Sequence, residues 1–289
     1  MKHLLAYLAL LVASTTATAS VSVVDDAGRT VVLAAPARRI VSLAPNITDT
    51  LFAAGAGAYV LGTSRFTEYP AEAKKVPVVG DATMIDLERI VGLKPDIVIV
   101  WKSGNAAAQV EKLIRLGLPV FYAETTRLAD VPSAVRRFGV LAGTEDTAER
   151  RARAFESSLE SLRTAYAGKR RLKVFYQVWD RPLMTVGHAQ IIDDALDLCG
   201  GDNIFADLTQ AAPVVGREAV IARRPDVVLG GGDGGALDDW KHTAFLPAAR
   251  KGNVISLDAP TLALPSPSIL SGVTMLCRAL DEARNRASH

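Results

Sequence analysis

Hydrophobic residues occur along the chain in short continuous runs, and each run follows or precedes a segment whose apolar positions recur at helical spacing. The clearest case is the run at residues 97–100, which comes after a predicted helix at 86–93 and the helix-ending Pro95. Continuous runs of this length are typical of parallel strands buried on both faces. The same alternation predicts strands at 39–43, 60–62, 119–122, 173–178, 227–229 and 253–257, and helices at 46–54, 110–116, 191–198 and 218–223. Such alternation indicates an α/β fold with parallel sheets.

Two sequence motifs of the first half of the chain recur in the second half. LERIVGLKPDIVIVW at 87–101 corresponds to REAVIARRPDVVLG at 217–230, and both place a Glu seven residues before a Pro-Asp pair. ITDTLFAAGAG at 47–57 likewise resembles IDDALDLCGGD at 192–202. Two widely separated copies are too few for a solenoid, so they predict two similar lobes.

A segment without any strand signal separates the two halves. Its apolar residues follow a helical period, and it ends in a predicted long helix at about 146–166. We therefore predict an α/β fold of two Rossmann-like lobes with mainly parallel sheets, bridged by one long α-helix. The predicted parts are an N-terminal lobe at 20–128, a helical linker at 129–170 and a C-terminal lobe at 171–289.

Residues 1–19 have the pattern of a secretory signal peptide. Lys2 gives a weakly basic start, residues 4–13 are apolar, and Ala17-Thr18-Ala19 is a small-x-small cleavage site. The apolar stretch is too short to span a bilayer, and no other segment predicts a membrane helix. We expect an exported protein that begins near Ser20; a buried N-terminal helix is the alternative.

Composition and charge limit the classes of function that we expect for this protein. Of 289 residues, 49% are hydrophobic and 22% charged, as in globular proteins. The formal net charge is +2, and Lys and Arg do not form a dense block. Because nucleic-acid binders usually carry a basic excess on one face, we predict no nucleic-acid partner.

Export changes how the two cysteines, Cys199 and Cys277, are interpreted. In an oxidising compartment an even pair favours a disulfide over a catalytic thiol. Closing so long a loop contributes roughly 4 kcal/mol in the chain-entropy model. Two separate buried thiols are the alternative.

Common catalytic motifs do not occur in the sequence. There is no G-x-S-x-G elbow, no phosphate-binding P-loop and no G-x-G-x-x-G after a strand. The glycine-rich run at 230–235 opens no clear helix, and we interpret it as a loop. His188 and His242 lack the spacing of zinc ligands, and we interpret them as surface or hinge residues. We expect neither catalysis nor a resident metal.

Aromatic residues follow several predicted strands, at the sheet edge where parallel α/β proteins bind ligands. Trp101 directly follows the run at 97–100, Tyr69 lies on the loop after the strand at 60–62, and Trp179 follows the first strand of the second lobe. Aromatic side chains from both lobes suit a flat, partly apolar ligand held between two walls. Packing of each ring beneath a loop is the alternative.

Several stretches resemble the family of periplasmic vitamin B12-binding proteins of ABC importers. They are IVSLAPNITDTLFAAGAG, SRFTEYPAEAKKVPVVGD, DLERIVGLKPDIVIVWKSGNAAAQVEKLIRLGLPV, LCGGDNIFADL and VGREAVIARRPDVVL, and the similarity covers nearly all the chain after residue 19. The resemblance implies a periplasmic solute-binding protein, not an enzyme, that captures vitamin B12 (cobalamin) or a related corrinoid in an interlobe cleft. It implies delivery to the permease and ATPase complex of an ABC importer in the inner membrane. Cobalamin would be a transported ligand and not a cofactor, and we expect a monomer.

The resemblance also carries site residues over to this chain. In the family, several positions carry aromatic side chains that line the ligand cleft, and three of them correspond to Tyr69, Trp101 and Phe205 in this chain. Two further positions that carry cleft tryptophans in the family are occupied here by Ala82 and Ala212. We therefore expect the ligand specificity of this chain to differ in detail from that of the family. Trp179 has no obvious counterpart and is a candidate to replace them from the second lobe.

In the family, one carboxylate at the tip of each lobe contacts arginines of the membrane transporter. The corresponding residues of this chain are Glu88 and Glu218. The alternative for both is stabilisation of a helix N-terminus by an acidic side chain in the first turn. The family also joins a Cys of its Cys-Gly-Gly motif to one in the final helix, which here are Cys199 and Cys277.

The same fold carries haem, siderophores and metal ions, so fold alone does not select the ligand. Haem binders usually have a Tyr ligand in a Gly-Tyr-x-Arg stretch where this chain has Val79-Gly80-Asp81-Ala82. Axial ligation of an iron would therefore fall to Tyr69 or His188. A haem, other tetrapyrrole or siderophore receptor is the alternative prediction.

Overall fold

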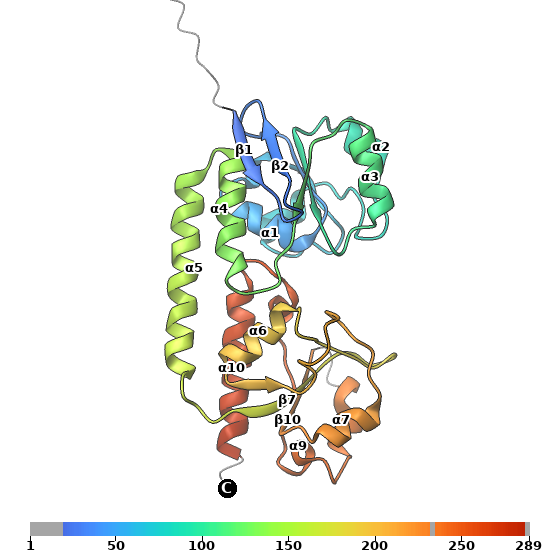
Figure 1. Cartoon of the computed structure of the whole chain (residues 1–289), viewed down its shortest axis with the longest axis vertical. Helices are drawn as coiled ribbons and strands as arrows, with labels where there is room; N and C mark the ends of the chain where they lie inside the picture. The colour runs from blue at the N-terminus through green and yellow to red at the C-terminus, as the bar shows by residue number, and fades with distance from the viewer. Residues whose placement is uncertain (1–19, 232–234, 287–289) are drawn as a thin grey trace, which may run out of the picture.

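The computed structural model of the protein describes residues 20–231 and 235–286. These residues form two lobes, each built on its own sheet, at opposite ends of the long axis of the molecule (Figure 1). The predicted α/β fold with two lobes and mainly parallel sheets is therefore confirmed. The residue boundaries given for the lobes stay predictions, and the predicted signal peptide lies outside the described residues.

The N-terminal lobe contains a four-stranded parallel sheet in the order β4-β3-β5-β6. Its strands are β3 (Ile40–Ser42), β4 (Val60–Gly62), β5 (Ile97–Trp101) and β6 (Val120–Ala123). Its helices are α1 (Pro45–Ala53), α2 (Leu87–Gly92) and α3 (Ala107–Arg115), with short 3-10 turns η1 (Gly57–Tyr59) and η2 (Ala71–Lys75). In β5, Ile97 and Ile99 pack in the core shared with α1, whereas Val98 and Val100 pack in the core shared with α2 and α3. Burial on both faces explains why this strand is a continuous apolar run.

An antiparallel hairpin that the sequence did not predict precedes this sheet. Its strands β1 (Val21–Val24) and β2 (Thr30–Leu33) pair along their whole length. Val23 and Val31 face the core of the N-terminal lobe, while Val24 and Val32 are exposed. Alternation over only four residues is a weak signal, which explains the omission.

The C-terminal lobe contains a sheet in the order β11-β10-β7-β8, with β9 also paired to β7. Its strands are β7 (Leu172–Trp179), β8 (Met184–Thr185), β9 (Gly201–Asn203), β10 (Val227–Gly230) and β11 (Val254–Ser256). Its helices are α6 (Ile191–Leu198), α7 (Arg217–Arg223), α8 (Asp238–Lys241), α9 (Pro247–Arg250) and α10 (Ile269–Arg286), with η3 (Gly235–Leu237) and η4 (Pro260–Ala263). All pairings are parallel except that of the short β8 with β7.

Two helices, α4 (Asp130–Ala142) and α5 (Glu145–Tyr166), connect the lobes. The longer one, α5, runs along one side of the molecule beside both lobes (Figure 1, yellow-green). Ala148 and Ala152 near its start belong to the core of the N-terminal lobe, and Phe155 and Leu159 farther along belong to the core of the C-terminal lobe. The predicted bridge by one long helix is thus confirmed, because a single helix is built into both cores.

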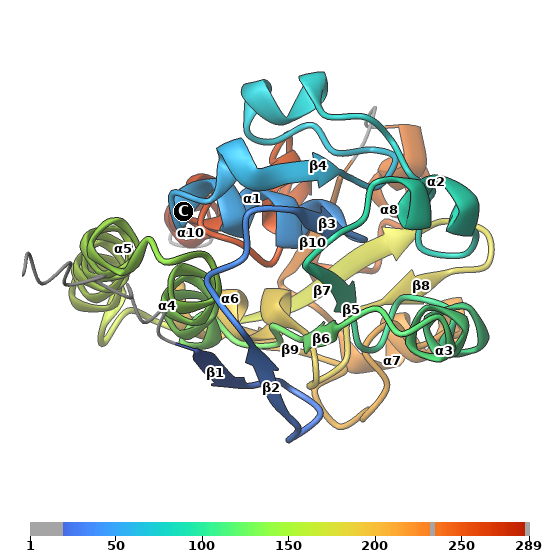
Figure 2. The same cartoon turned by 90° about the horizontal axis from the view of Figure 1, so that it is seen from above.

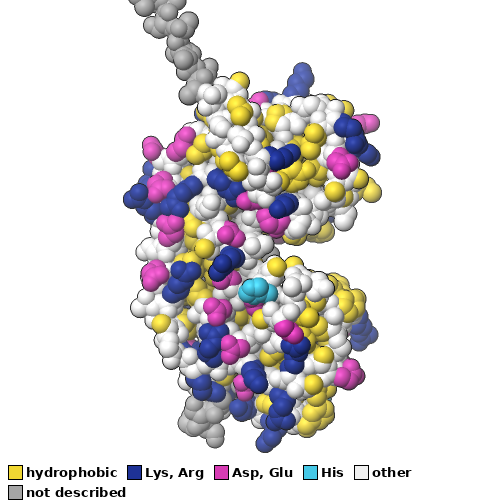
Figure 3. Space-filling model, viewed as in Figure 1, with side chains coloured by type: hydrophobic (Ala, Val, Ile, Leu, Met, Phe, Trp, Pro, Cys, Tyr) yellow, Lys and Arg dark blue, Asp and Glu magenta, His cyan; other side chains and the backbone are white. Residues whose placement is uncertain are grey.

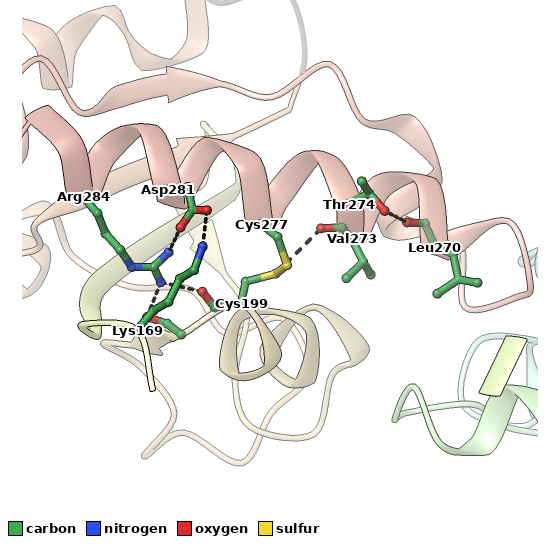
Figure 4. The surroundings of a disulfide bond; sticks show 9 residues. Lys169, Cys199, Leu270, Val273, Thr274, Cys277, Asp281 and Arg284 are labelled. Atoms are coloured by element: carbon green, nitrogen blue, oxygen red, sulfur yellow. Dashed lines mark hydrogen bonds and ion pairs between the residues drawn. A yellow bond between two sulfur atoms is a disulfide. The ribbon is translucent and has the colours of Figure 1, made fainter. Parts of the chain in front are cut away.

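The predicted disulfide between Cys199 and Cys277 is present. It joins the C-terminal end of α6 to the middle of α10, and both side chains are fully buried (Figure 4). Nearby, the Arg284 guanidinium on α10 donates to the backbone carbonyls of Cys199 and Gly200. The contact between α6 and α10 is therefore held by hydrogen bonds as well as by the covalent bond.

Candidate ligand-binding cleft

The space between the lobes is open on the side of the molecule away from α5 (Figure 3). Seen along the long axis, α4 and α5 lie at one edge, whereas α2, α3, α7 and α8 lie toward the other (Figure 2). Ligands of parallel α/β sheets bind outside the carboxyl ends of the strands. The residues that follow the strands of both sheets are therefore the candidates for a binding site.

In the N-terminal lobe, Trp101 is the last residue of β5 and is held in place from several sides. Its indole N–H donates to a carboxylate oxygen of Glu124 at 3.1 Å, and the other oxygen of Glu124 accepts from the Ser103 N–H at 2.9 Å. The Trp101 backbone N–H donates to the side-chain oxygen of Asn105, which is buried. The ring lies so close to Gly104 that an added Cβ would overlap it. Trp101 is thus a half-buried, fixed aromatic side chain at the sheet edge.

Tyr69 lies on the loop after β4, together with Phe66. Four buried hydroxyl groups anchor the start of this loop, with successive oxygens 2.6–3.0 Å apart: Ser42, Thr48, Thr63 and Thr67. Tyr69 is 36% exposed and Phe66 is 76% exposed. The hydroxyl chain therefore fixes a loop that presents two aromatic side chains to solvent, although Phe66 was not among the predicted site residues.

Ala82, where the family has a tryptophan, lies in a tight turn. The Asp81 carboxylate accepts from the backbone N–H groups of Thr83 and Met84, both at 2.9 Å. Hydrogen bonds from the Met84 and Thr83 N–H groups and the Thr83 hydroxyl hold the pKa of Asp81 below its usual range. The turn leaves Met84 72% exposed, so a flexible apolar side chain is available beside Ala82.

In the C-terminal lobe, Trp179 ends β7 and is 62% exposed. Its indole N–H donates to the Arg181 carbonyl at 3.0 Å, within the turn that leads to β8. Val178 beside it is also exposed. This edge of the second sheet therefore carries an accessible aromatic and an accessible aliphatic side chain, and Val178 is a second candidate that the sequence did not single out.

Phe205 differs from the other predicted aromatics, because only 2% of its surface is exposed. Its ring meets Phe175 edge-on with centroids 6.0 Å apart, and the Arg223 guanidinium lies 4.4 Å above it. The side chain therefore packs in the core of the lobe in this structure. Its role in ligand binding stays a prediction.

The sequence signals for Phe66, Met84 and Val178 differ. Phe66 and Met84 are large apolar residues in loops, whereas Val178 lies within β7, one residue before Trp179. The search for aromatics at strand ends overlooked Met84 and Val178 because they are not aromatic. It overlooked Phe66 because Tyr69 already represented that loop.

Two pockets lie near these residues. One, of about 380 Å³, lies at the carboxyl edge of the second sheet and is lined by the end of β7, the start of α6 and residues 257–260. The other, of about 620 Å³, lies between α1, α5 and the start of α10. Neither pocket is lined by a predicted site residue. The smaller one is lined by Val178, the chain neighbour of Trp179, and lies where parallel sheets bind ligands, so we assign it to the cleft.

Glu88 and Glu218 are exposed and lie in the first turns of α2 and α7. Within the described part of the chain, neither carboxylate forms a hydrogen bond or an ion pair. The N-terminus of α2 is capped instead by Asp86, which accepts from the Arg89 N–H at 2.9 Å. Asp86 thus supplies the capping hydrogen bond of α2, while the first-turn positions of Glu88 and Glu218 fit the alternative of stabilising a helix N-terminus by charge. Transporter docking by the two acids stays a prediction.

His188, one of the two alternatives for axial ligation of an iron, lies beside a carboxylate. His188 is exposed, and its Nδ1 lies 3.1 Å from a carboxylate oxygen of Asp193. Across residues 20–231 and 235–286, no three His, Cys, Asp or Glu side chains are grouped as a metal site. In the same residues, no helix has the length and apolar character needed to cross a membrane.

Comparisons with known proteins agree on one family. Residues 40–261 match the family described as periplasmic binding protein. A vitamin B12-binding protein of Vibrio parahaemolyticus is 32% identical over 255 residues, which are 87% of this chain and 92% of that protein. A vitamin B12-binding protein of Salmonella paratyphi A is 35% identical over 250 residues, or 85% of this chain and 91% of that protein.

Solved structures give the same grouping. The periplasmic vitamin B12 binding protein of Vibrio cholerae aligns with a TM-score of 0.80 at 31% identity, covering 86% of this chain and 98% of that one. A periplasmic heme-binding protein from Roseiflexus aligns with a TM-score of 0.74 at 26% identity, covering 85% and 98%.

Proposed function

The chain belongs to the periplasmic binding protein family, and from that premise we propose that it captures vitamin B12 or a related corrinoid between its lobes and delivers it to an ABC importer. The observation that carries the proposal is the similarity to vitamin B12-binding proteins, at 32–35% identity over at least 85% of the chain. The heme-binding relative is less similar in sequence and in structure. A haem or siderophore receptor is the second candidate.

The side chains of the cleft support a broad, partly apolar ligand. A corrin ring is mostly apolar and is fringed with amides. Trp101 provides a fixed aromatic wall in one lobe, and Trp179 provides an exposed one in the other. Aromatic contacts of this kind contribute about 0.5–1.5 kcal/mol beyond burial of area. We propose that Trp179 replaces the family tryptophans that fall on Ala82 and Ala212, and that Tyr69 and Phe205 complete the aromatic set.

Calorimetric titration with cyanocobalamin and with haemin tests this assignment. We expect saturable heat with cyanocobalamin and weaker or no heat with haemin. Tight binding of haemin without cyanocobalamin heat would overturn the corrinoid assignment in favour of the second candidate.

We also propose that the protein is a receptor and not an enzyme, and that it acts as a monomer in the periplasm. Mass spectrometry should therefore recover the cobalamin unchanged after incubation with the protein.

The proposed partner is the permease and ATPase complex of an importer, with Glu88 and Glu218 as docking residues. Both acids are exposed and make no bond with the described residues, which leaves them available to basic side chains of a permease. Changing both to Ala should leave cyanocobalamin affinity intact and abolish uptake through the partner transporter. A matched control changes Glu111 and Glu282, exposed acids elsewhere on the two lobes, and should keep uptake. Normal uptake by the first double variant would remove the two acids from docking.

A further inference from the structure

Tyr176 combines burial with an unused hydroxyl group. It lies two residues before Val178 on β7, and only 7% of its surface is exposed. Its phenol oxygen forms no hydrogen bond with any described residue. Within the described residues the hydroxyl oxygen is not one of the buried side-chain atoms without a partner, so solvent reaches it from the pocket. An accessible hydroxyl without a protein partner, on a ring that is otherwise buried, is suited to a hydrogen bond with a ligand.

The pocket that Tyr176 lines is the one of about 380 Å³ at the carboxyl edge of the second sheet. That volume is near the lower end of the range for small-molecule sites, about 300–1,000 Å³. It is therefore suited to one arm of a large ligand and not to a whole tetrapyrrole. Its apolar lining comes from Val178, Ile192, Leu257, Ala259, Pro260 and Ala263. Such a lining favours an aliphatic arm with a polar end.

Three polar groups on the lining are free to meet that end. One is the Tyr176 hydroxyl. The second is the amide NH₂ of Gln190, whose oxygen already accepts from the Ile192 N–H at the start of α6. The third is the carboxylate of Asp258, which is exposed and has no partner among the described residues. Gln177 is not available, because its amide is bonded to Ala236 and Trp240.

These groups match a carboxamide better than a carboxylate. A carboxamide oxygen can accept from the Tyr176 hydroxyl or the Gln190 NH₂, while its NH₂ group donates to Asp258. A carboxylate would face Asp258 with like charge, and the described residues that line the pocket include no Lys or Arg to offset the repulsion. Burial raises the pKa of Tyr176 to about 12, so its hydroxyl remains a neutral donor at physiological pH.

We propose that this pocket is a subsite for one carboxamide arm of the bound corrinoid, with Tyr176 donating to the amide oxygen and Asp258 rejecting a carboxylate. The proposal rests on the proposed function and adds a basis for selectivity to it. A ligand whose arms end in carboxylates, such as haem with its propionates, is disfavoured at this position. Likewise, a corrinoid with the matching amide hydrolysed should be disfavoured.

The test is calorimetric titration of the purified protein with cyanocobalamin and with its monocarboxylates, in each of which one peripheral amide has been hydrolysed. For the wild type we expect one monocarboxylate isomer to bind at least about tenfold more weakly than cyanocobalamin. Asp258→Asn should recover most of that loss for the same isomer. Tyr176→Phe should weaken cyanocobalamin binding about three- to tenfold, the usual range for one hydrogen bond. Thermal unfolding checks that both variants fold.

Two control variants and three contrary outcomes complete the test. Tyr166→Phe and Asp146→Asn change the same residue types outside the pocket and should leave all affinities unchanged. Equal binding of all isomers by the wild type, or unchanged cyanocobalamin binding by Tyr176→Phe, would overturn the subsite while leaving the corrinoid receptor intact. No binding of cyanocobalamin by the wild type would overturn the corrinoid assignment and the subsite with it.

Discussion

Removal of the disulfide tests the energetics of the C-terminal lobe. The variant changes Cys199 and Cys277 together to Ala, which keeps each Cβ and removes the two buried sulfur atoms. The cysteines are separated by 78 residues, and for a loop of that length the chain-entropy model gives about 4.5 kcal/mol at room temperature. Because the free energy of unfolding of whole domains is about 5–15 kcal/mol, this is a large fraction of the total.

The folded state should survive the change. The hydrogen bonds from Arg284 reach backbone carbonyls at residues 199 and 200, which Ala retains. The ion pair between Lys169 and Asp281 is also unaffected by the substitution. The loss should therefore come mainly from a less restricted unfolded chain, and cyanocobalamin affinity at low temperature should not change.

Urea unfolding followed by circular dichroism measures the effect. We expect the free energy of unfolding to fall by about 3–5 kcal/mol, and the same fall when the wild type is refolded with a reducing agent. The reducing agent should have no effect on the double variant. A fall below about 1 kcal/mol would refute the loop-entropy argument, and a large loss of cyanocobalamin affinity would show that the bond instead shapes the folded state.

Three further predictions test the packing, the ion pairs and the cleft. Gly272→Ala places a Cβ 2.5 Å from the Leu262 backbone nitrogen, so we expect a loss of about 1–3 kcal/mol in thermal unfolding despite the better helix propensity of Ala; Gly92→Ala, with nothing within 4 Å, should be neutral or stabilising. Hydrogen bonds from Arg136 and Arg153 lower the pKa of Glu149 to about 2 from the ordinary 4.5. The stability that Glu149 contributes should therefore be present above pH 4.5 and lost as the pH falls toward 2, and urea unfolding of Glu149→Gln across that window should show a smaller pH dependence than the wild type. Trp101→Ala should weaken cyanocobalamin binding about tenfold or more in calorimetry, through loss of its aromatic contact and area; unchanged affinity would remove Trp101 from the site.

Much of the fold was predictable because its strands are buried on both faces. The predicted helix at 191–198 has the same bounds as α6, and the strand predicted at 97–100 differs from β5 by one residue. The hairpin of β1 and β2 and the short β9 were missed. The strand Gly201–Asn203 contains no apolar side chain. Its conformation therefore depends on pairing with β7 and not on local sequence.

The site was less predictable, because exposure depends on tertiary contacts. Topology alone places Trp101 and Trp179 at sheet edges, but it does not reveal that Phe205 lies between Phe175 and Arg223 in the core. In the sequence, Tyr176 is one apolar residue in a strand run. The role we propose for it depends on a hydroxyl that has no partner among the described residues, and only the three-dimensional structure can show that.

The motif that occurs in both lobes contains two acidic residues, a Glu and an Asp, whose contacts in the structure differ. In the first copy, Asp96 of the Pro-Asp pair accepts from the Arg39 N–H at 2.9 Å, next to the start of β3. In the second copy, Asp226 accepts from the Lys173 N–H at 3.1 Å, at the start of β7. The repeated Asp therefore fastens the beginning of a neighbouring strand in both lobes. The repeated Glu has no such bond in either copy within the described residues. The repeated Asp therefore has a structural role in both lobes, whereas the repeated Glu lies in the first turn of a helix in both lobes, where an acidic side chain stabilises the helix N-terminus. Docking of the Glu pair on an external partner stays a prediction, which the uptake assay of the double variant tests.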